Sequence, residues 1–375
     1  HGLRERYWQR CKHELIKKNL LNATMNFQHR LRMFLKHIML SKGSALTLSH
    51  YNYRIEFQLR GAPHAHGTLW MDWKRFTALP RPTVDCIQRA LNLIKAGEQH
   101  DEDMKHALTQ FADLFVSVSL QNPSTAAIVK EVNVHHHTRK ACQKYGTICR
   151  FNFPKFPIHK TIISAPSNIT YPDEKERKTV MKRHTEFLEG VKEVLQNEDA
   201  MRDICSYKQN QIKMISRDWH VKWKICEIVR EAEYNKKASV FVPQDLHFML
   251  NDILNSEGFA SVQQLSAVAA QIPNHKEALS TIMRERVVNL LEQVDPSKVD
   301  TKFSLMQQYE DALSVNKKGY SVHYKRDVAE TMVNTYNPEW INAWNGNMDF
   351  QLCLDYFAVI TYISDYYCKD VSGTM

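Results

Sequence analysis

The stretch that decides the fold is Tyr53-Arg54-Ile55-Glu56-Phe57-Gln58-Leu59-Arg60-Gly61-Ala62-Pro63-His64-Ala65-His66. In its first half apolar and polar residues alternate, which is the pattern of a β-strand with one apolar and one polar face. A turn containing Gly and Pro follows at 61–63, and a second alternating run then extends from His64 to Met71. Two short alternating runs joined by such a turn predict a β-hairpin.

The polar face of this hairpin carries a candidate metal site. Residues two apart on a strand point to the same side, so the imidazoles of His64 and His66 project together. Two nitrogens and one oxygen without a thiolate suit Mg²⁺ or Mn²⁺ bridging a phosphate, with Zn²⁺ as the alternative. The candidates for the oxygen ligand are Glu56 and Gln58 from the first strand, and Asp349 and Gln351 from a late segment. A polar face without a metal is the competing interpretation.

Two tyrosines near the end of the sequence are candidate nucleophiles. Tyr362 and Tyr366 are four residues apart within a helical pattern over 354–368, with Lys369 almost one turn further on. Residues at this spacing share one face of a helix. A phenol with a pKa near 10 is a poor nucleophile until a metal or another cation stabilises the phenolate or polarises its target. The alternative is that both tyrosines belong to a core or an interface.

A third group of residues has the composition of a zinc site. Two histidines and two cysteines fall within fifteen residues: His135, His137, Cys142 and Cys149. Tetrahedral zinc accepts two imidazoles and two thiolates, and such an ion can staple a loop that lacks regular structure. His136 is an alternative to either histidine, and a basic loop without a metal is the alternative to the site. The remaining cysteines are scattered without a regular framework, which indicates a reducing compartment.

The positive charge of the chain is concentrated in one region. The 375 residues carry a formal net charge of +9, and the segment from Arg139 to Arg183 accounts for +8 of it. Its first half interleaves aromatic residues with Arg139, Lys140, Lys144, Arg150 and Lys155. Cations among aromatic rings suit phosphate contacts and base stacking on single-stranded DNA. The half after Asp173 fits equally well a solvated helix face whose charges are paired.

The pattern along the chain predicts an α+β fold with a small antiparallel sheet, surrounding helices, a zinc-stapled loop and a large helical insertion. Five segments are expected: N-terminal helices over 1–47, the metal-site sheet with helices over 48–125, the basic Cys/His loop over 126–170, the helical insertion over 171–330, and a late strand with the tyrosine helix over 331–375. No apolar run approaches the roughly 20 residues needed to span a bilayer, so no membrane partner is expected.

Several of these blocks resemble one known family. The hairpin stretch is similar to the HUH endonuclease motif of Helitron transposases, the replication-initiator-like domain of rolling-circle transposons. Three later blocks resemble the following motifs of that family: Cys149-Arg150-Phe151-Asn152-Phe153-Pro154-Lys155, Tyr336-Asn337-Pro338 with Trp344-Asn345-Gly346-Asn347-Met348-Asp349-Phe350-Gln351, and Tyr362-Ile363-Ser364-Asp365-Tyr366-Tyr367-Cys368-Lys369. The resemblance does not cover about 173–314. It implies an HUH-type sheet.

The resemblance also implies an activity. In the family, His64 and His66 would hold the divalent metal, and Tyr362 or Tyr366 would attack a phosphate of single-stranded DNA, with Lys369 in the same motif. The products would be a 5′-phosphotyrosine and a free 3′-OH, which allow strand transfer between transposon ends and target DNA. The alternatives are a single-stranded DNA-binding module that has lost catalysis, and a viral or plasmid rolling-circle initiator.

The same resemblance implies a larger context. Because the sequence begins with His1 and contains no Walker phosphate loop, we expect it to be the endonuclease part of a longer transposase. The partner expected within that polypeptide is a helicase domain. The resemblance implies a nuclear location, and the sequence itself shows no targeting signal.

Overall fold

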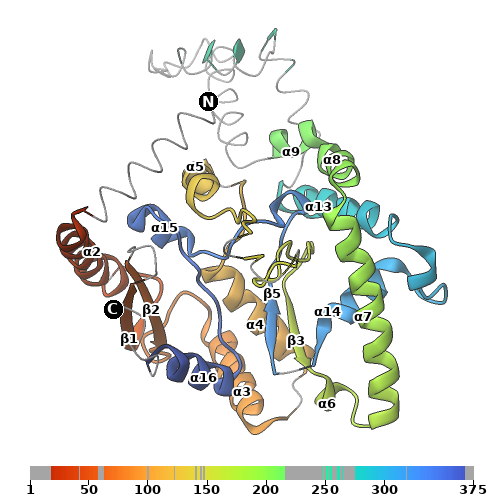
Figure 1. Cartoon of the computed structure of the whole chain (residues 1–375), viewed down its shortest axis with the longest axis horizontal. Helices are drawn as coiled ribbons and strands as arrows, with labels where there is room; N and C mark the ends of the chain where they lie inside the picture. The colour runs from red at the N-terminus through yellow and green to blue at the C-terminus, as the bar shows by residue number, and fades with distance from the viewer. Residues whose placement is uncertain are drawn as a thin grey trace, which may run out of the picture.

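The protein combines helices with two small sheets, as the computed structural model shows (Figure 1). The structure describes residues 18–41, 43–57, 63–98, 101–121, 123–139, 142–143, 146, 148–215, 275–317 and 319–367, with a few positions between 248 and 264. The expected α+β class is therefore confirmed. Within the described residues, no helix is both long and apolar enough to cross a membrane.

The predicted hairpin is present. Strand β1 (Leu48–Phe57) pairs antiparallel with β2 (Pro63–Met71), and the register places Glu56 opposite His64 and Arg54 opposite His66. Directly opposed residues of an antiparallel pair share a face, so these side chains lie on the same side of the hairpin. Gly67 permits the close pairing, since a Cβ atom at this position would lie 2.7 Å from the carbonyl oxygen of Asn52.

The hairpin packs against a first hydrophobic core made by three helices. These are α2 (Leu20–Phe34), α3 (Arg81–Ala96) and α4 (Glu102–Phe115), and a short π-helix (Leu35–Met39) continues α2. Helix α4 begins where the side chain of Asp101 accepts a hydrogen bond from the Met104 amide at 2.8 Å. Helix α3 ends at Gly97, whose φ of 74° is in the left-handed region that favours glycine. Ile87 and Leu108 are fully buried in this core.

A second core lies between the helices that follow the Cys/His loop (Figure 1). Its helices are α7 (Glu174–Gln196), α8 (Glu198–Ser206), α13 (His275–Leu291) and α14 (Leu305–Ser314), with α9 (Gln209–Ile215) beside α13. Tyr309 is completely buried in it and donates from its hydroxyl to the carbonyl of Pro157 at 2.8 Å. The loop that precedes α7 is therefore attached to the second core.

A three-stranded sheet was not predicted from the sequence. Its central strand β3 (Ile162–Pro166) pairs in parallel with β4 (Val315–Asn316) and antiparallel with β5 (Ser321–His323). Strands of two to five residues are too short to show a period of two. The central strand belongs to the expected loop segment and its two neighbours to the expected helical insertion, so the sheet joins these two segments.

The prediction of a late strand, which falls at Asn347–Gln351, is wrong. The structure has no strand in this described segment. Its backbone is held by scattered partners and not by a neighbouring strand. The Met348 amide donates to the side chain of Asn133 at 2.8 Å, and the Phe350 amide donates to the carbonyl of Thr335 at 3.1 Å. The segment runs from α15 (Pro338–Trp344) to α16 (Tyr356–Tyr367), which is the predicted tyrosine helix.

Three shorter helical segments lie near the candidate sites. They are α5 (Pro123–Val132), which leads into the Cys/His loop, α6 (Ser167–Thr170), which follows β3, and the 3-10 turn Val328–Glu330. Helix α5 was missed, since its ten residues lie in a stretch without a clear apolar period.

A buried ion pair between Arg286 and Asp327 connects α13 of the second core to the segment around Asp327. The guanidinium of Arg286, on α13, donates to the Asp327 carboxylate at 2.9 Å, and the side chains are only 2% and 1% exposed. The same guanidinium donates to the carbonyls of Tyr207 and Cys205 at 3.0 and 2.5 Å. A buried charge is tolerated when its partners satisfy it in this way.

We therefore expect Arg286→Ala to lower the free energy of unfolding by about 3–5 kcal/mol, because it leaves the Asp327 carboxylate buried without its cation. Urea denaturation followed by circular dichroism measures the loss. Arg284→Ala, at an exposed position of the same helix, is the control and should change stability by less than about 0.5 kcal/mol. Equal losses in both variants would contradict the importance of the pair.

Candidate functional site

The candidate metal site on the hairpin converges around His66. The register places Glu56 and His64 opposite each other, and the Glu56 carboxylate oxygen Oε2 lies 3.0 Å from Nε2 of His66. The rings of His64 and His66 have centroids 6.4 Å apart on the same face. The contact between Glu56 and His66 is that of an ion pair or a hydrogen bond, and within the described residues Glu56, His64 and His66 do not form a cluster as compact as that of the Cys/His loop.

Tyr362 is brought to this site from the far end of the sequence. Its hydroxyl forms a hydrogen bond of 3.1 Å with Nδ1 of His66, 296 residues earlier in the chain. The two rings meet at 64° with centroids 6.3 Å apart, and the tyrosine is 38% exposed. Figure 1 shows α16 beside one end of the β1–β2 hairpin. A candidate nucleophile, a histidine and a carboxylate therefore form a continuous chain of contacts.

The environment of His64 keeps its imidazole neutral. Burial, followed by the neighbouring His66, lowers the pKa of His64 below its ordinary value, while Glu56 acts in the opposite direction. Metal ions bind the neutral form of histidine. The direction of this shift therefore favours the ligand form of His64 around neutral pH.

The other residues predicted for this site are placed differently. Gln351 and Asp349 bond to each other, with the Gln351 amide donating to Asp349 at 2.8 Å, and Asp349 also accepts from the Thr335 hydroxyl at 2.8 Å. Among the four candidates for the oxygen ligand, Glu56 is the one with a contact to a hairpin histidine in the described residues. Gln58 and Lys369 lie outside the described residues, as does the side chain of Tyr366.

The Cys/His loop brings its four predicted ligands together. The ligand atoms of His135, His137, Cys142 and Cys149 all lie within 4.8 Å of one another. Sγ of Cys142 is 3.6 Å from Nδ1 of His137, and Sγ of Cys149 is 3.4 Å from Nε2 of His135. Ligands of a tetrahedral zinc ion are separated by roughly 3.3–3.8 Å, so the cluster is able to bind zinc.

Hydrogen bonds and stacking hold the ligands of this cluster in place. The amide of His135 donates to the carbonyl of Met332 at 2.7 Å, and its ring stacks on Phe153 with centroids 4.3 Å apart. The amide of Arg150 donates to the carbonyl of Cys142 at 2.9 Å, which joins the two cysteine segments. Burial, then His137, His136 and Lys155, lowers the pKa of His135 and favours its neutral ligand form.

The structure also resolves the choice among the three adjacent histidines. His135 and His137 are two apart, and both have a ring nitrogen within 4.8 Å of the cysteine sulfurs, whereas His136 is not part of the cluster. In an extended backbone, alternate residues point to the same side. The alternation explains why the middle histidine is excluded.

The basic segment divides into two parts with different charge environments. On α7, three predicted cations have acidic partners: Lys178 with Glu174 at 2.6 Å, Lys182 with Glu186 at 3.8 Å and Arg183 with Asp300 at 3.2 Å. Lys175 and Arg177 of this half have no ion pair among the described residues, so three of its five cations are paired. In the loop half, Lys160 pairs with Glu310 at 2.6 Å, whereas Arg139, Arg150 and Lys155 have no ion pair among the described residues, and Lys140 and Lys144 lie outside them.

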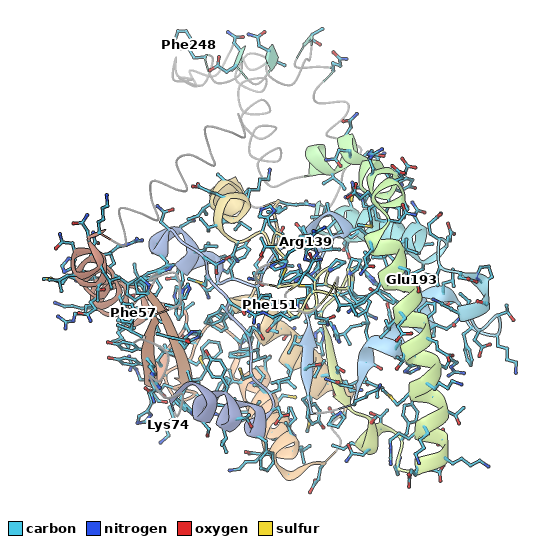
Figure 2. All side chains as sticks on the ribbon, viewed as in Figure 1. Phe57, Lys74, Arg139, Phe151, Glu193 and Phe248 are labelled. Carbon is cyan, nitrogen blue, oxygen red and sulfur yellow. The ribbon has the colours of Figure 1, made fainter. Side chains whose placement is uncertain are left out.

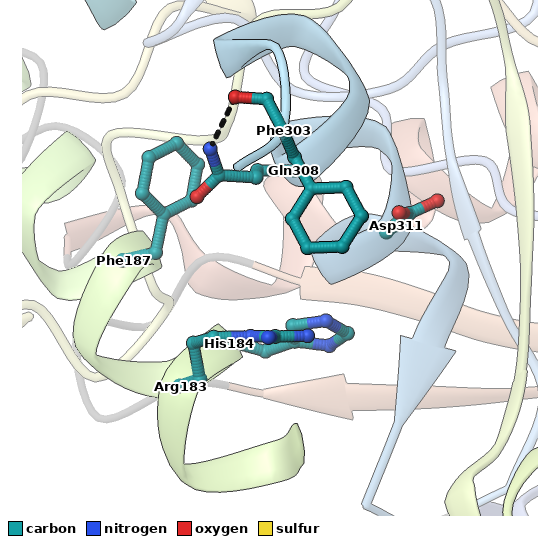
Figure 3. A pocket seen from close by; sticks show the side chains of 6 residues that line it. All are labelled: Arg183, His184, Phe187, Phe303, Gln308 and Asp311. Carbon is teal, nitrogen blue, oxygen red and sulfur yellow. Dashed lines mark hydrogen bonds between the residues drawn. The ribbon is translucent and has the colours of Figure 1, made fainter. Parts of the chain in front are cut away.

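A small cavity lies between α7 and α14 (Figure 3). Its lining comprises Arg183, His184, Phe187, Phe303, Gln308 and Asp311, and its volume is about 30 Å³. The Gln308 amide donates to the carbonyl of Phe303 at 3.0 Å. Nδ1 of His184 is buried without a hydrogen-bond partner among the described residues. A space of this size holds about one water molecule, which could satisfy the ring nitrogen, and is too small for a nucleotide.

No family model, curated protein or solved structure matches this chain. The class that the structure itself defines is a mixed α+β protein with a His/Cys cluster able to bind zinc. A second constellation, made of Glu56, His66 and Tyr362, stands at the hairpin.

We expect the purified protein to contain one zinc ion per chain at the Cys/His cluster. Cys149→Ser and His137→Ala should each reduce the zinc content at least about tenfold, because three ligands bind zinc much more weakly than four. Inductively coupled plasma mass spectrometry after extensive dialysis measures the metal.

His136→Ala is the matched control, since His136 is adjacent to both ligands and lies outside the cluster. It should retain the full zinc content. Loss of zinc in this variant, or retention in both ligand variants, would contradict the assignment of the ligands.

Proposed function

We propose that the protein is a metal-dependent endonuclease and strand transferase that acts on single-stranded DNA, with Tyr362 as the first nucleophile. The observation that carries this proposal is the contact between the Tyr362 hydroxyl and His66, whose other ring nitrogen faces the Glu56 carboxylate. The resemblance of the hairpin and the tyrosine motif to Helitron transposases supports the same chemistry.

The residues at the hairpin have separable roles in this reaction. Glu56, His64 and His66 would hold a divalent ion such as Mg²⁺ or Mn²⁺, which supplies charge neutralisation at the scissile phosphate. If Nε2 of His66 bound the ion, Nδ1 would remain available to hold Tyr362, which it contacts at 3.1 Å. Metal-bound histidines commonly donate their other ring N–H to a neighbouring acceptor. His66 would then hold the Tyr362 hydroxyl beside the metal site.

The bond changes balance without a cofactor beyond the metal. The Tyr362 oxygen would form a bond to phosphorus and release its phenolic proton to water, while the bond from phosphorus to the 3′ oxygen of the preceding nucleotide would break. That oxygen takes up a proton and becomes a free 3′-OH, and the 5′ phosphate remains on the tyrosine. Because the phosphodiester energy is conserved in the adduct, a second 3′-OH can reverse the step and join a new strand.

Tyr366 would have a different role from Tyr362. It lies one helical turn further along α16, so both residues cannot occupy the position next to His66 at the same time. We propose that Tyr366 accepts the second strand after rearrangement of the helix. Two tyrosines would allow two adducts in one transfer cycle.

The Cys/His cluster has a structural role in this proposal. Four protein ligands close the coordination sphere of zinc, whereas catalytic zinc sites keep an open position. We infer that Zn²⁺ at His135, His137, Cys142 and Cys149 fixes the loop between α5 and β3. The catalytic metal and the structural metal are then two separate ions of different chemistry.

A labelled single-stranded oligonucleotide incubated with the protein and Mn²⁺ should yield a denaturant-resistant protein–DNA adduct. Tyr362→Phe removes the nucleophile and should reduce adduct formation at least about 100-fold, and His66→Ala should reduce it by a similar factor. Tyr366→Phe should leave the first adduct within a few-fold of the wild type. Denaturing gel electrophoresis with peptide mapping identifies the modified residue.

Tyr51→Phe, an exposed tyrosine on β1, is the control for loss of a phenol elsewhere on the hairpin. The proposal fails if the wild-type protein forms no adduct with any single-stranded substrate under these conditions. Binding without an adduct would favour the DNA-binding module. An adduct that maps to Tyr366 in the wild type would reverse the assigned order of the tyrosines.

A further inference from the structure

A group of cations and aromatic rings lies beside the Cys/His cluster and apart from the hairpin. We call it the anchor face, and it consists of Arg150, Phe151, Lys155 and Lys192. The first three residues follow the last cluster ligand, Cys149, whereas Lys192 comes from α7, in the region that the family resemblance does not cover. Arg139 and Phe151 project from the same loop near the centre of Figure 2.

Contacts between α7 and the loop fix the position of Lys192. Its ammonium group donates to the side-chain oxygen of Asn152 and lies 5.5 Å from the centre of the Phe156 ring. Asn152 itself has a φ of 59°, a left-handed conformation that asparagine tolerates better than most residues. The loop and the helix therefore present their cations together.

The aromatic part of the anchor face is accessible. Phe151 is 46% exposed, and the guanidinium of Arg150 lies over its ring at 4.6 Å. Lys155 donates to the carbonyl of Phe151 at 2.8 Å and lies 4.9 Å from the centre of the Phe153 ring. A flat, exposed ring flanked by positive charge is a platform on which an unpaired base can stack.

The cations of the anchor face form no ion pair with the part of the chain that the structure describes. Within the described residues, Arg150, Lys155 and Lys192 have no ion pair, whereas Lys178 and Lys182 on the same helix α7 are paired with glutamates. Asp349 acts electrostatically on Lys155, and Glu189 on Lys192, but neither carboxylate forms an ion pair with these lysines. Cations that lack an ion-pair partner are stabilised by a bound polyanion such as the phosphate backbone.

We propose that the anchor face binds single-stranded DNA at a position outside the catalytic hairpin, with a base stacked on Phe151 and phosphates contacted by Arg150, Lys155 and Lys192. This deepens the proposed function, because it assigns a second region that holds the substrate, and it requires binding only and no cleavage. The preference is for a single strand because the bases of a duplex are already stacked on each other and present no free face to Phe151.

Binding of a fluorescein-labelled oligothymidine, followed by fluorescence anisotropy in a Tyr362→Phe background, tests this proposal without interference from cleavage. Phe151→Ala should weaken binding about fivefold or more and leave the salt dependence unchanged. Lys192→Ala and Arg150→Ala should each weaken binding and reduce the slope of log K against log salt by about 0.7, as expected when one phosphate contact with a single strand is lost.

Lys178→Ala and Lys182→Ala are the matched controls, because they remove paired cations from the same helix. They should bind DNA like the parent protein. Zinc content and circular dichroism verify that each variant is folded. Lys192→Arg keeps the positive charge, so its slope of log K against log salt should equal that of the parent protein.

Three outcomes would overturn the proposal. The first is equal affinity of the anchor-face variants and the controls. The second is competition by duplex DNA as effective as that by the single strand, which would remove the role of stacking. The third is a preference of more than about tenfold for single-stranded RNA, which would change the partner. The binding assay uses the Tyr362→Phe variant and requires no cleavage. It therefore tests the anchor face even if the wild-type protein does not nick DNA.

Discussion

The antiparallel register of β1 and β2 is the constraint on which the candidate catalytic site depends. It places Glu56 and His64 opposite each other and keeps His66 on the same face. A shift of one residue would move both histidines to the other side of the hairpin. The close backbone approach at Gly67 helps to maintain this pairing, since any side chain there would collide with the carbonyl of Asn52.

The two candidate sites are built in different ways. At the hairpin, regular strands position the side chains, and α16 adds Tyr362 from the other end of the chain. In the Cys/His loop the backbone is irregular, and the ligands are held by scattered hydrogen bonds and by stacking on Phe153. A metal ion contributes most where regular structure is absent, because it replaces the constraints that a strand or helix would supply.

Periodic segments could be predicted well from the sequence, and short or irregular ones could not. The hairpin and the tyrosine helix agree with the patterns that predicted them. The sheet β4-β3-β5 was missed because its strands have two to five residues. The strand predicted at Asn347–Gln351 does not form, since Asn133 and Thr335 supply the partners that a neighbouring strand would have provided.

The sequence by itself determined the residue types of both candidate sites and the location of the positive charge. Spacing places His64 with His66, and the four Cys/His ligands lie within fifteen residues, so local geometry brings each set close. Only the tertiary structure placed Tyr362 against His66 and brought Lys192 to the loop. These two contacts join residues 296 and 40 positions apart, and their formation depends on packing between elements that no local pattern encodes.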